Sequence, residues 1–169
     1  MFSSAMTKKA KHAMALLAGS NRMLCSAESC TGGLFSASIT MLPGASGVFE
    51  RGYITYSNAS KIELLTVPTY FIEDYGAVSL ETAIAMAEGA LLMSRADVSV
   101  AITGVAGPDG GTKEKPVGTV FIATAIKNGR SMCQRLQLSG KRLEIQLTSV
   151  EAALDAVCLR LEEPSLLTS

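Results

Sequence analysis

The chain is organised around nine consecutive residues, Cys25-Ser26-Ala27-Glu28-Ser29-Cys30-Thr31-Gly32-Gly33. The apolar run at the start of this stretch predicts a buried strand over residues 23–28. The two glycines at its end open an amphipathic segment, which predicts a helix over about residues 31–42. Ser29 therefore stands where a strand ends and a helix begins.

A hydroxyl at such a junction can serve catalysis or structure. Unpaired backbone N–H groups and the positive end of the helix dipole face whatever docks there. Ser29 beside such donors makes half of an acyl-transfer site: the hydroxyl attacks a carbonyl, while N–H groups near Thr31, Gly32 and Gly33 stabilise the oxyanion. The structural alternative is a residue that only caps the helix.

A serine nucleophile needs a base, and histidine is almost absent. His12 is the only histidine, and it lies on a helix predicted over residues 3–18, so we expect neither a Ser-His nor a Cys-His catalyst. Cys30 is the rival nucleophile, because a thiolate attacks well and this residue also lies near a helix N-terminus. We expect Cys30 to point away as a small buried hydrophobe.

Tyr56 and Lys61 form a second cluster. Tyr56 ends a strand predicted over residues 51–56, and Lys61 falls in the first turn of the helix that follows. The helix N-terminus and burial both disfavour a charged ammonium, so both lower the pKa of a lysine there. A neutral lysine can take a proton from a serine and replace histidine as the base. The alternative is the commoner solvated lysine.

A glycine-rich segment follows a third strand, predicted over residues 97–103. It reads Thr103-Gly104-Val105-Ala106-Gly107-Pro108-Asp109-Gly110-Gly111-Thr112. It lacks the ending of a P-loop and the glycine spacing of the dinucleotide fingerprint, and no helix follows it. One interpretation is a flexible turn. The other is a loop whose backbone N–H groups approach a ligand at the carboxyl end of a strand.

The remaining elements predict the fold class. Further helices are predicted at about residues 59–65, 79–93 and 140–162. Asn128-Gly129 joins two strands, residues 117–126 and 131–138, into a hairpin. The alternation of strands and helices predicts one α/β domain over residues 1–169. We expect a three-layer α/β/α sandwich with a mixed sheet of about five strands, one of them antiparallel.

The composition excludes several classes of function. The formal net charge is zero and no basic stripe with interleaved aromatic residues is present, so nucleic acid is not an expected partner. The sequence contains no run of 18 apolar residues, so we expect no segment that crosses a membrane. Residues 1–11 lack the apolar core of a secretory signal. These features predict a cytoplasmic protein without a membrane partner.

The cysteines do not suggest a metal site. The four cysteines stand far apart, without CxxC spacing, so in a cytoplasmic chain we expect reduced thiols rather than disulfides or zinc ligands. Paired carboxylates and clusters of metal-ligand residues are also missing from the sequence. We therefore expect no metal.

Several segments, in one order, resemble the CinA C-terminal domain family, also known as the nicotinamide-nucleotide amidohydrolases. The matching segments are Ala27 to Gly33, Phe49 to Asn58 with Lys61, Gly76 to Ser79, Ile102 to Gly111, and Glu114 to Val120. The resemblance covers about residues 8–162. It implies hydrolysis of the carboxamide of nicotinamide mononucleotide, giving nicotinic acid mononucleotide and ammonia, without a cofactor.

The resemblance also implies roles for individual residues. Ser29 matches the nucleophile, Lys61 the general base and Tyr56 its hydroxyl partner. Substrate binding is implied for Thr31, Gly32, Gly33, Thr103, Gly104, Ala106, Gly107 and Arg142. The implied partner is a small pyridine nucleotide, and assembly into a homo-oligomer is left open.

The sequence departs from the family at the start of its last helix. Family members often read Ser-Gly-Asp-Arg there, with another arginine soon after, whereas this chain has Lys141 before Arg142 and then Gln146. The resemblance still implies that Arg142 is a phosphate contact.

Many family members carry a larger N-terminal domain, which this sequence lacks, so we expect a stand-alone deamidase here. The alternatives are an enzyme for another small amide, a silent nucleotide-binding module and an interaction protein.

Overall fold

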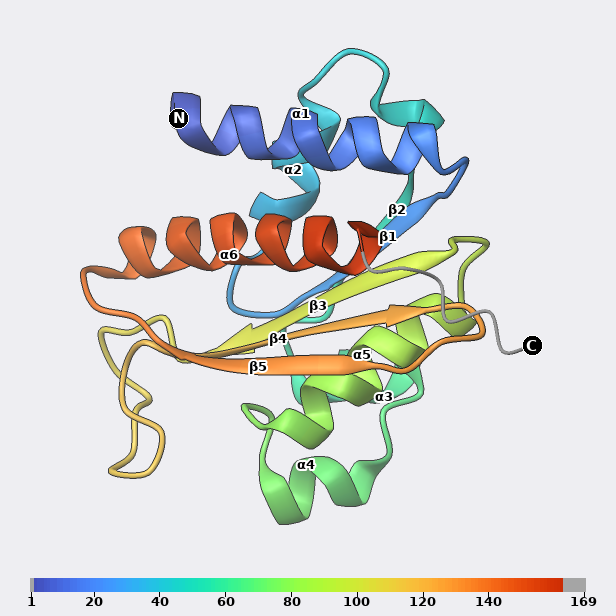
Figure 1. Ribbon diagram of the computed structural model, residues 1–169. Helices are drawn as coiled ribbons and strands as arrows, with labels where there is room; N and C mark the ends of the chain where they lie inside the picture. Colours follow the sequence, from blue (N-terminus) through green and yellow to red (C-terminus); the bar gives the residue numbers. More distant parts are fainter. Residues whose placement is uncertain (1, 163–169) are drawn as a thin grey trace.

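The computed structural model describes residues 2–162 as a five-stranded sheet between two layers of helices (Figure 1). In chain order the elements are α1 (Ser4–Gly19), β1 (Leu24–Glu28), α2 (Leu34–Thr40), the short 3-10 helix η1 (Ala45–Gly47), β2 (Phe49–Ile54), α3 (Asn58–Leu65), α4 (Thr69–Tyr75), α5 (Leu80–Leu92), β3 (Val98–Gly104), β4 (Thr119–Ile126), β5 (Met132–Gln137) and α6 (Arg142–Glu162). The predicted three-layer α/β/α sandwich is confirmed.

The sheet has the strand order β2-β1-β3-β4-β5. β1 pairs in parallel with β2 and with β3, whereas β4 pairs antiparallel with β3 and with β5. β4 therefore runs against the other four strands and is the one antiparallel strand that the sequence predicts. The carboxyl ends of β2, β1, β3 and β5 consequently lie at one edge of the sheet, where α/β proteins bind their ligands.

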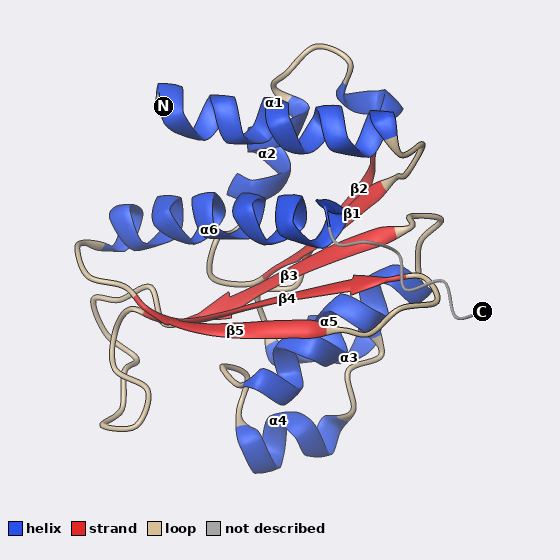
Figure 2. Ribbon diagram, in the orientation of Figure 1, coloured by secondary structure: helices blue, strands red, loops and turns tan. Residues whose placement is uncertain are grey.

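Helices cover both faces of the sheet (Figure 2). α1, α2 and α6 enclose one apolar cluster, which includes Leu17, Phe35 and Leu154. α3, α4 and α5 lie on the other face, where α5 packs through small side chains such as Ala83 and Ala87. Since both faces are covered, β1 and the first six residues of β3 are buried, including the polar residues Ser26 and Ser99.

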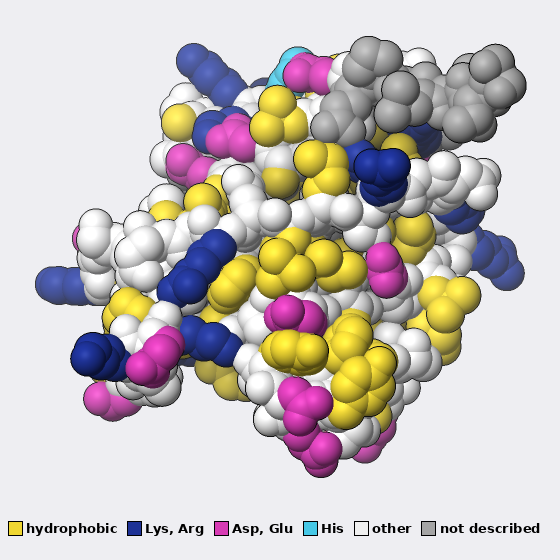
Figure 3. Space-filling view, turned by 60° about the horizontal axis from the view of Figure 1, so that its bottom comes forward, with side chains coloured by type: hydrophobic (Ala, Val, Ile, Leu, Met, Phe, Trp, Pro, Cys, Tyr) yellow, Lys and Arg dark blue, Asp and Glu magenta, His cyan; other side chains and the backbone are white. Residues whose placement is uncertain are grey.

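α4 is the least buried helix of the second layer. None of its residues is buried, and the face that carries it shows a patch of hydrophobic side chains (Figure 3). The exposed apolar side chains of α3 to α5 on this side include Leu64, Tyr70, Tyr75 and Leu80.

None of the helices within residues 2–162 has the length and apolar character that a membrane span requires.

The start of α2 differs from the prediction. The helix begins at Leu34 and not near residue 31, because Gly32 and Gly33 adopt φ values of +59° and +101°. These left-handed conformations suit glycine and do not continue a right-handed helix. Residues 30–33 therefore form a turn between Ser29 and the helix.

The packing of α5 against α3 gives a stability prediction. A Cβ atom at Gly89 would collide with the backbone carbonyl of Leu65, whereas a Cβ at Gly19, in α1, would meet nothing within 4 Å. We expect Gly89→Ala to destabilise the protein by about 1–3 kcal/mol, as overpacking does. Gly19→Ala should be neutral or slightly stabilising. Thermal melting of both variants measures the difference, and equal melting temperatures would contradict the close packing of these helices.

Candidate active site

Four segments meet at the carboxyl edge of the sheet. Ser29 directly follows β1, Tyr56 follows β2, the glycine-rich loop follows β3, and Arg142 begins α6 after β5. These segments line a pocket with a volume of about 260 Å³. The loop after β3 and the start of α6 lie at the same end of the molecule (Figure 1). The sheet topology thus brings together residues that are more than 100 positions apart.

A buried lysine lies beneath this pocket, against the serine. Lys61 is only 1% exposed. Its Nζ lies 3.0 Å from Ser29 Oγ, 2.8 Å from the Thr55 carbonyl oxygen and 3.4 Å from the Tyr56 carbonyl oxygen. Among residues 2–162, no carboxylate forms an ion pair with Lys61. The predicted proximity of Ser29 and Lys61 is therefore present in the structure.

The surroundings of Lys61 favour its neutral form. Burial lowers the pKa of Lys61 to about 8, because the ammonium loses its hydration. A neutral amine has two N–H groups and one lone pair. The carbonyl oxygens of Thr55 and Tyr56 can accept the two N–H groups, which leaves the lone pair for the hydroxyl of Ser29. In this arrangement the lysine can accept the serine proton.

Local structure fixes the position of Lys61. The Ser57 hydroxyl accepts a hydrogen bond from the Ser60 N–H and caps α3, so Lys61 falls in the first helical turn. The Thr55 N–H donates to the carbonyl of Glu28 at 2.8 Å, and the Ser29 N–H donates to the carbonyl of Ile102 at 2.9 Å. These bonds extend the sheet past the strand ends and hold Ser29 and the segment before Lys61 in register.

Glu28 is a site residue that the sequence analysis did not single out. Its side chain is fully buried. Oε2 accepts hydrogen bonds from the Thr31 hydroxyl and from the N–H groups of Gly33 and Phe35. Oε1 accepts from the N–H and the hydroxyl of Ser36. A carboxylate of this chain therefore occupies the N-terminus of α2. A glutamate just before a Gly-Gly helix start was the available signal.

This carboxylate corrects the predicted oxyanion donors. The Gly33 N–H is taken by Glu28, and the Gly32 N–H donates to the carbonyl of Ser29. Thr31, Gly32 and Gly33 do not line the pocket, since the turn carries them away from it. The N–H groups of Cys30 and Thr31 donate to no other group within residues 2–162.

Cys30 packs in the core, as predicted. It is 5% exposed and belongs to the apolar cluster of α1, α2 and α6. Burial raises the pKa of its thiol to about 12, so the group stays protonated and is a poor nucleophile near neutral pH. Its carbonyl oxygen accepts a hydrogen bond from Gln146 Nε2 at 2.8 Å. Gln146 thereby ties the turn after Ser29 to α6.

The Tyr56 hydroxyl is not the partner of Lys61 that we expected. It accepts a hydrogen bond from Arg142 Nη2 at 2.9 Å, and Lys61 contacts only the backbone carbonyl of Tyr56. The reason is the alternation of side chains along an extended chain. Thr55 points inward and is fully buried, so Tyr56 points outward, is 60% exposed and borders the pocket.

The other predicted binding residues divide into two groups. Gly104, Ala106 and Gly107 line the pocket together with Arg142. Arg142 Nη1 donates to the Gly107 carbonyl at 2.7 Å. Thr103 does not line the pocket, because its buried hydroxyl donates to the Ala77 carbonyl. The sequence analysis assigned no role to Val78, which also lines the pocket.

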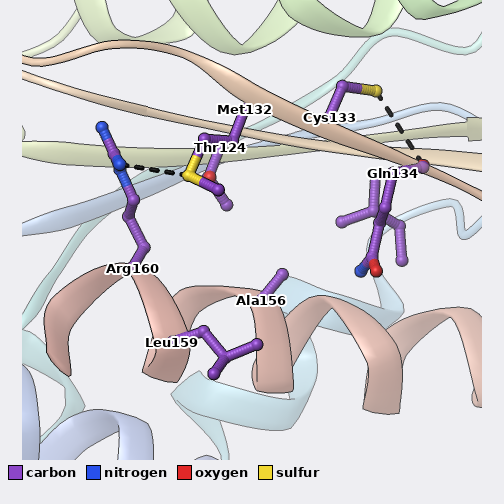
Figure 4. A pocket seen from close by; sticks show the side chains of 8 residues that line it. Thr124, Met132, Cys133, Gln134, Ala156, Leu159 and Arg160 are labelled. Atoms are coloured by element: carbon purple, nitrogen blue, oxygen red, sulfur yellow. Dashed lines mark hydrogen bonds between the residues drawn. The ribbon is translucent and has the colours of Figure 1, made fainter. Parts of the chain in front are cut away.

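A second hollow lies between β4, β5 and the later part of α6 (Figure 4). It is lined by Met132, Cys133, Ala156 and Leu159, among others. Burial raises the pKa of the Cys133 thiol to about 11, and Cys133 Sγ contacts the backbone oxygen of Gln134. This hollow offers no serine–base pair. Within residues 2–162, no group of three or more His, Cys, Asp or Glu side chains could hold a metal ion.

The fold and the first pocket define an α/β protein with a buried serine–lysine pair at the carboxyl edge of its sheet. The model of the CinA C-terminal domain matches residues 6–161, so the chain belongs to this family. A solved structure, the competence/damage inducible protein CihA from Agrobacterium tumefaciens, superposes with a TM-score of 0.92. It is 40% identical, and the match covers 95% of this chain and 98% of that chain.

Two relatives show the range of names in the family. A CinA-like protein of Geotalea uraniireducens is 50% identical over 80% of this chain and 32% of that protein. The chain thus spans about a third of the length of such relatives. The nicotinamide-nucleotide amidohydrolase PncC of Enterobacter agglomerans is 51% identical over 72% of this chain and 74% of that protein.

The buried carboxylate of Glu28 gives a second stability prediction. In Glu28→Gln, the amide NH₂ must face one of the donors that the carboxylate now satisfies, so buried N–H groups lose their acceptor. We expect a loss of about 1–3 kcal/mol in the free energy of unfolding. Glu144→Gln is the matched control, because Glu144 accepts the Lys141 N–H at an exposed helix start. Urea denaturation should show a much smaller loss there, and equal losses would contradict the prediction.

Proposed function

We propose that this chain hydrolyses the carboxamide of nicotinamide mononucleotide, giving nicotinic acid mononucleotide and ammonia, with Ser29 as nucleophile and Lys61 as base. The observation that carries the proposal is the buried Nζ of Lys61, 3.0 Å from Ser29 Oγ and without a carboxylate partner in the described part of the chain. The choice of substrate is supported by the 51% identical relative named nicotinamide-nucleotide amidohydrolase.

In the first step, neutral Lys61 takes the proton of the Ser29 hydroxyl while Oγ attacks the carboxamide carbon. The carbonyl oxygen becomes an oxyanion, and we assign its stabilisation to the N–H group of Cys30. Cys30 directly follows Ser29 and lines the pocket, and its N–H has no acceptor within residues 2–162. Loss of one oxyanion donor typically costs about 10²–10³-fold in rate.

In the second step, the ammonium of Lys61 gives its proton to the departing nitrogen, and the C–N bond breaks to release ammonia. An ester between Ser29 and the acyl group remains. Water then attacks this ester and transfers its proton to the again neutral Lys61. Lys61 returns that proton to Ser29 Oγ as the acid leaves. Apart from this water, the cycle uses only groups of the chain and the substrate.

Arg142 is the group that we assign to the substrate phosphate. Its hydrogen bonds to Gly107 and Tyr56 hold the guanidinium at the pocket and use only two of its five N–H donors. Helix N-termini often bind phosphate, but the N-terminus of α2 already holds the Glu28 carboxylate. Tyr56 thus serves by positioning Arg142 and by forming the pocket wall.

The direct test is an ammonia assay over a panel of pyridine nucleotides, other small amides and free nicotinamide. We expect stoichiometric ammonia release from nicotinamide mononucleotide. Ser29→Ala should abolish turnover, whereas Cys30→Ala should keep most of it, because the Cys30 thiol stays protonated. An inactive Cys30→Ala beside an active Ser29→Ala would assign the nucleophile to the cysteine, and a preference for another amide would replace the substrate.

The pKa of Lys61 sets the expected pH dependence. The neutral base becomes more abundant as the pH rises, so kcat should increase through about pH 8 and level off above it. Lys61→Arg keeps a cation that cannot give up its proton, so it should be as inactive as Lys61→Met. Measuring kcat across pH for folded variants decides this. Substantial turnover by Lys61→Arg would show that the residue acts only as a cation.

A further inference from the structure

Two side chains of opposite charge line the pocket without pairing with each other. They are Asp109, on the loop after β3, and Arg142, at the start of α6. Arg142 donates to the Gly107 carbonyl and the Tyr56 hydroxyl. Asp109 takes part in no hydrogen bond or ion pair within residues 2–162. Asp109 is also the only acidic side chain that lines this pocket in the described part of the chain.

The loop keeps these two charges apart. Gly107 and Gly110 adopt φ values of +79° and +88°, which set the direction of the chain on either side of Asp109. The Thr112 N–H donates to the Lys115 carbonyl, and Lys115 Nζ donates to the Tyr75 carbonyl at 2.6 Å. The bond from Arg142 to the Gly107 carbonyl on one side of Asp109, and the bond from Lys115 to Tyr75 on the other, tie the loop to other parts of the protein. Both side chains are exposed, so water solvates their charges until a ligand binds. A pocket that presents both charges suits a ligand that also carries both.

We propose that Asp109 is a specificity-determining residue that recognises the positive charge on the pyridinium ring of the substrate. The proposal rests on the function proposed above. A ribosylated nicotinamide ring is a cation, whereas free nicotinamide and the reduced dihydropyridine ring are neutral. With Arg142 at the phosphate, Asp109 supplies the second charge that matches a zwitterionic pyridine mononucleotide.

This charge recognition also favours the chemical step. A cationic ring withdraws electrons from its carboxamide, so the amide carbon is more electrophilic than that of a neutral ring. A pocket that selects the cation therefore selects the amide that Ser29 attacks more readily. Asp109 need not touch the reacting carbon to have this effect.

The test measures binding in a Ser29→Ala background, so that the ligands are not consumed. Three ligands separate the charges: nicotinamide mononucleotide has both, its dihydropyridine form has only the phosphate, and nicotinamide riboside has only the cation. We expect Asp109→Asn to weaken binding of the mononucleotide and the riboside by about fivefold, the scale of a solvent-exposed ion pair. Binding of the dihydropyridine form should not change. Arg142→Gln should weaken the two phosphorylated ligands and spare the riboside.

Asp74→Asn, on α4, is the matched control, because it makes the same charge change outside the pocket lining. It should leave all three dissociation constants unchanged. Equal weakening of the oxidised and reduced mononucleotides by Asp109→Asn, or no weakening at all, would overturn the proposal, as would a failure of all three ligands to bind. The protein with Ser29 intact is assayed for ammonia release in parallel. Charge-dependent binding without ammonia release would refute the proposed function and leave the role of Asp109 standing.

Discussion

The burial of the Lys61 amine is the constraint on which the site depends. A cation at this depth needs either a carboxylate or a set of polar acceptors. The structure gives Lys61 two backbone carbonyls and the Ser29 hydroxyl. The acceptors come from the ends of neighbouring parallel strands, which are joined by the bond from the Thr55 N–H to the Glu28 carbonyl. The register of β1 and β2 therefore sets the distance between Ser29 Oγ and Lys61 Nζ.

Two helix N-termini near this pair have opposite roles. At α2, the positive end of the helix stabilises the buried Glu28 carboxylate, which holds the turn after Ser29. At α3, the positive end lies near a lysine and opposes its charge. One helix thus holds an anion beside the turn after Ser29, and the other carries Lys61, whose pKa burial lowers to about 8. The N-terminus of α2 is thus occupied, and Arg142 is the only cationic side chain that lines the pocket in the described part of the chain.

Much of this arrangement could be predicted from the sequence, because strands end and helices begin at local signals. The strand before Ser29, the helix that carries Lys61 and the loop after β3 all follow from such signals, and parallel strands bring their ends together. The contacts of long side chains could not be predicted. Arg142 lies 86 residues from Tyr56, and their hydrogen bond depends on how α6 packs over the sheet. Glu28 was missed because a glutamate before a Gly-Gly helix start is a weak local signal, and the contacts of its side chain depend on the conformation of the turn at residues 30–33.

The pocket has two parts that are built by different segments. The serine–lysine pair depends on β1, β2 and α3, whereas the charged wall depends on the loop after β3 and the start of α6. The departures from the family pattern at Lys141 and Gln146 fall in the second part. Gln146 supports the Cys30 carbonyl without adding a charge, so only Arg142 of these three residues lines the pocket as a cation. At the start of α6, Arg142 therefore faces the pocket without contacting Ser29 or Lys61, whereas Gln146 contacts the turn that follows Ser29.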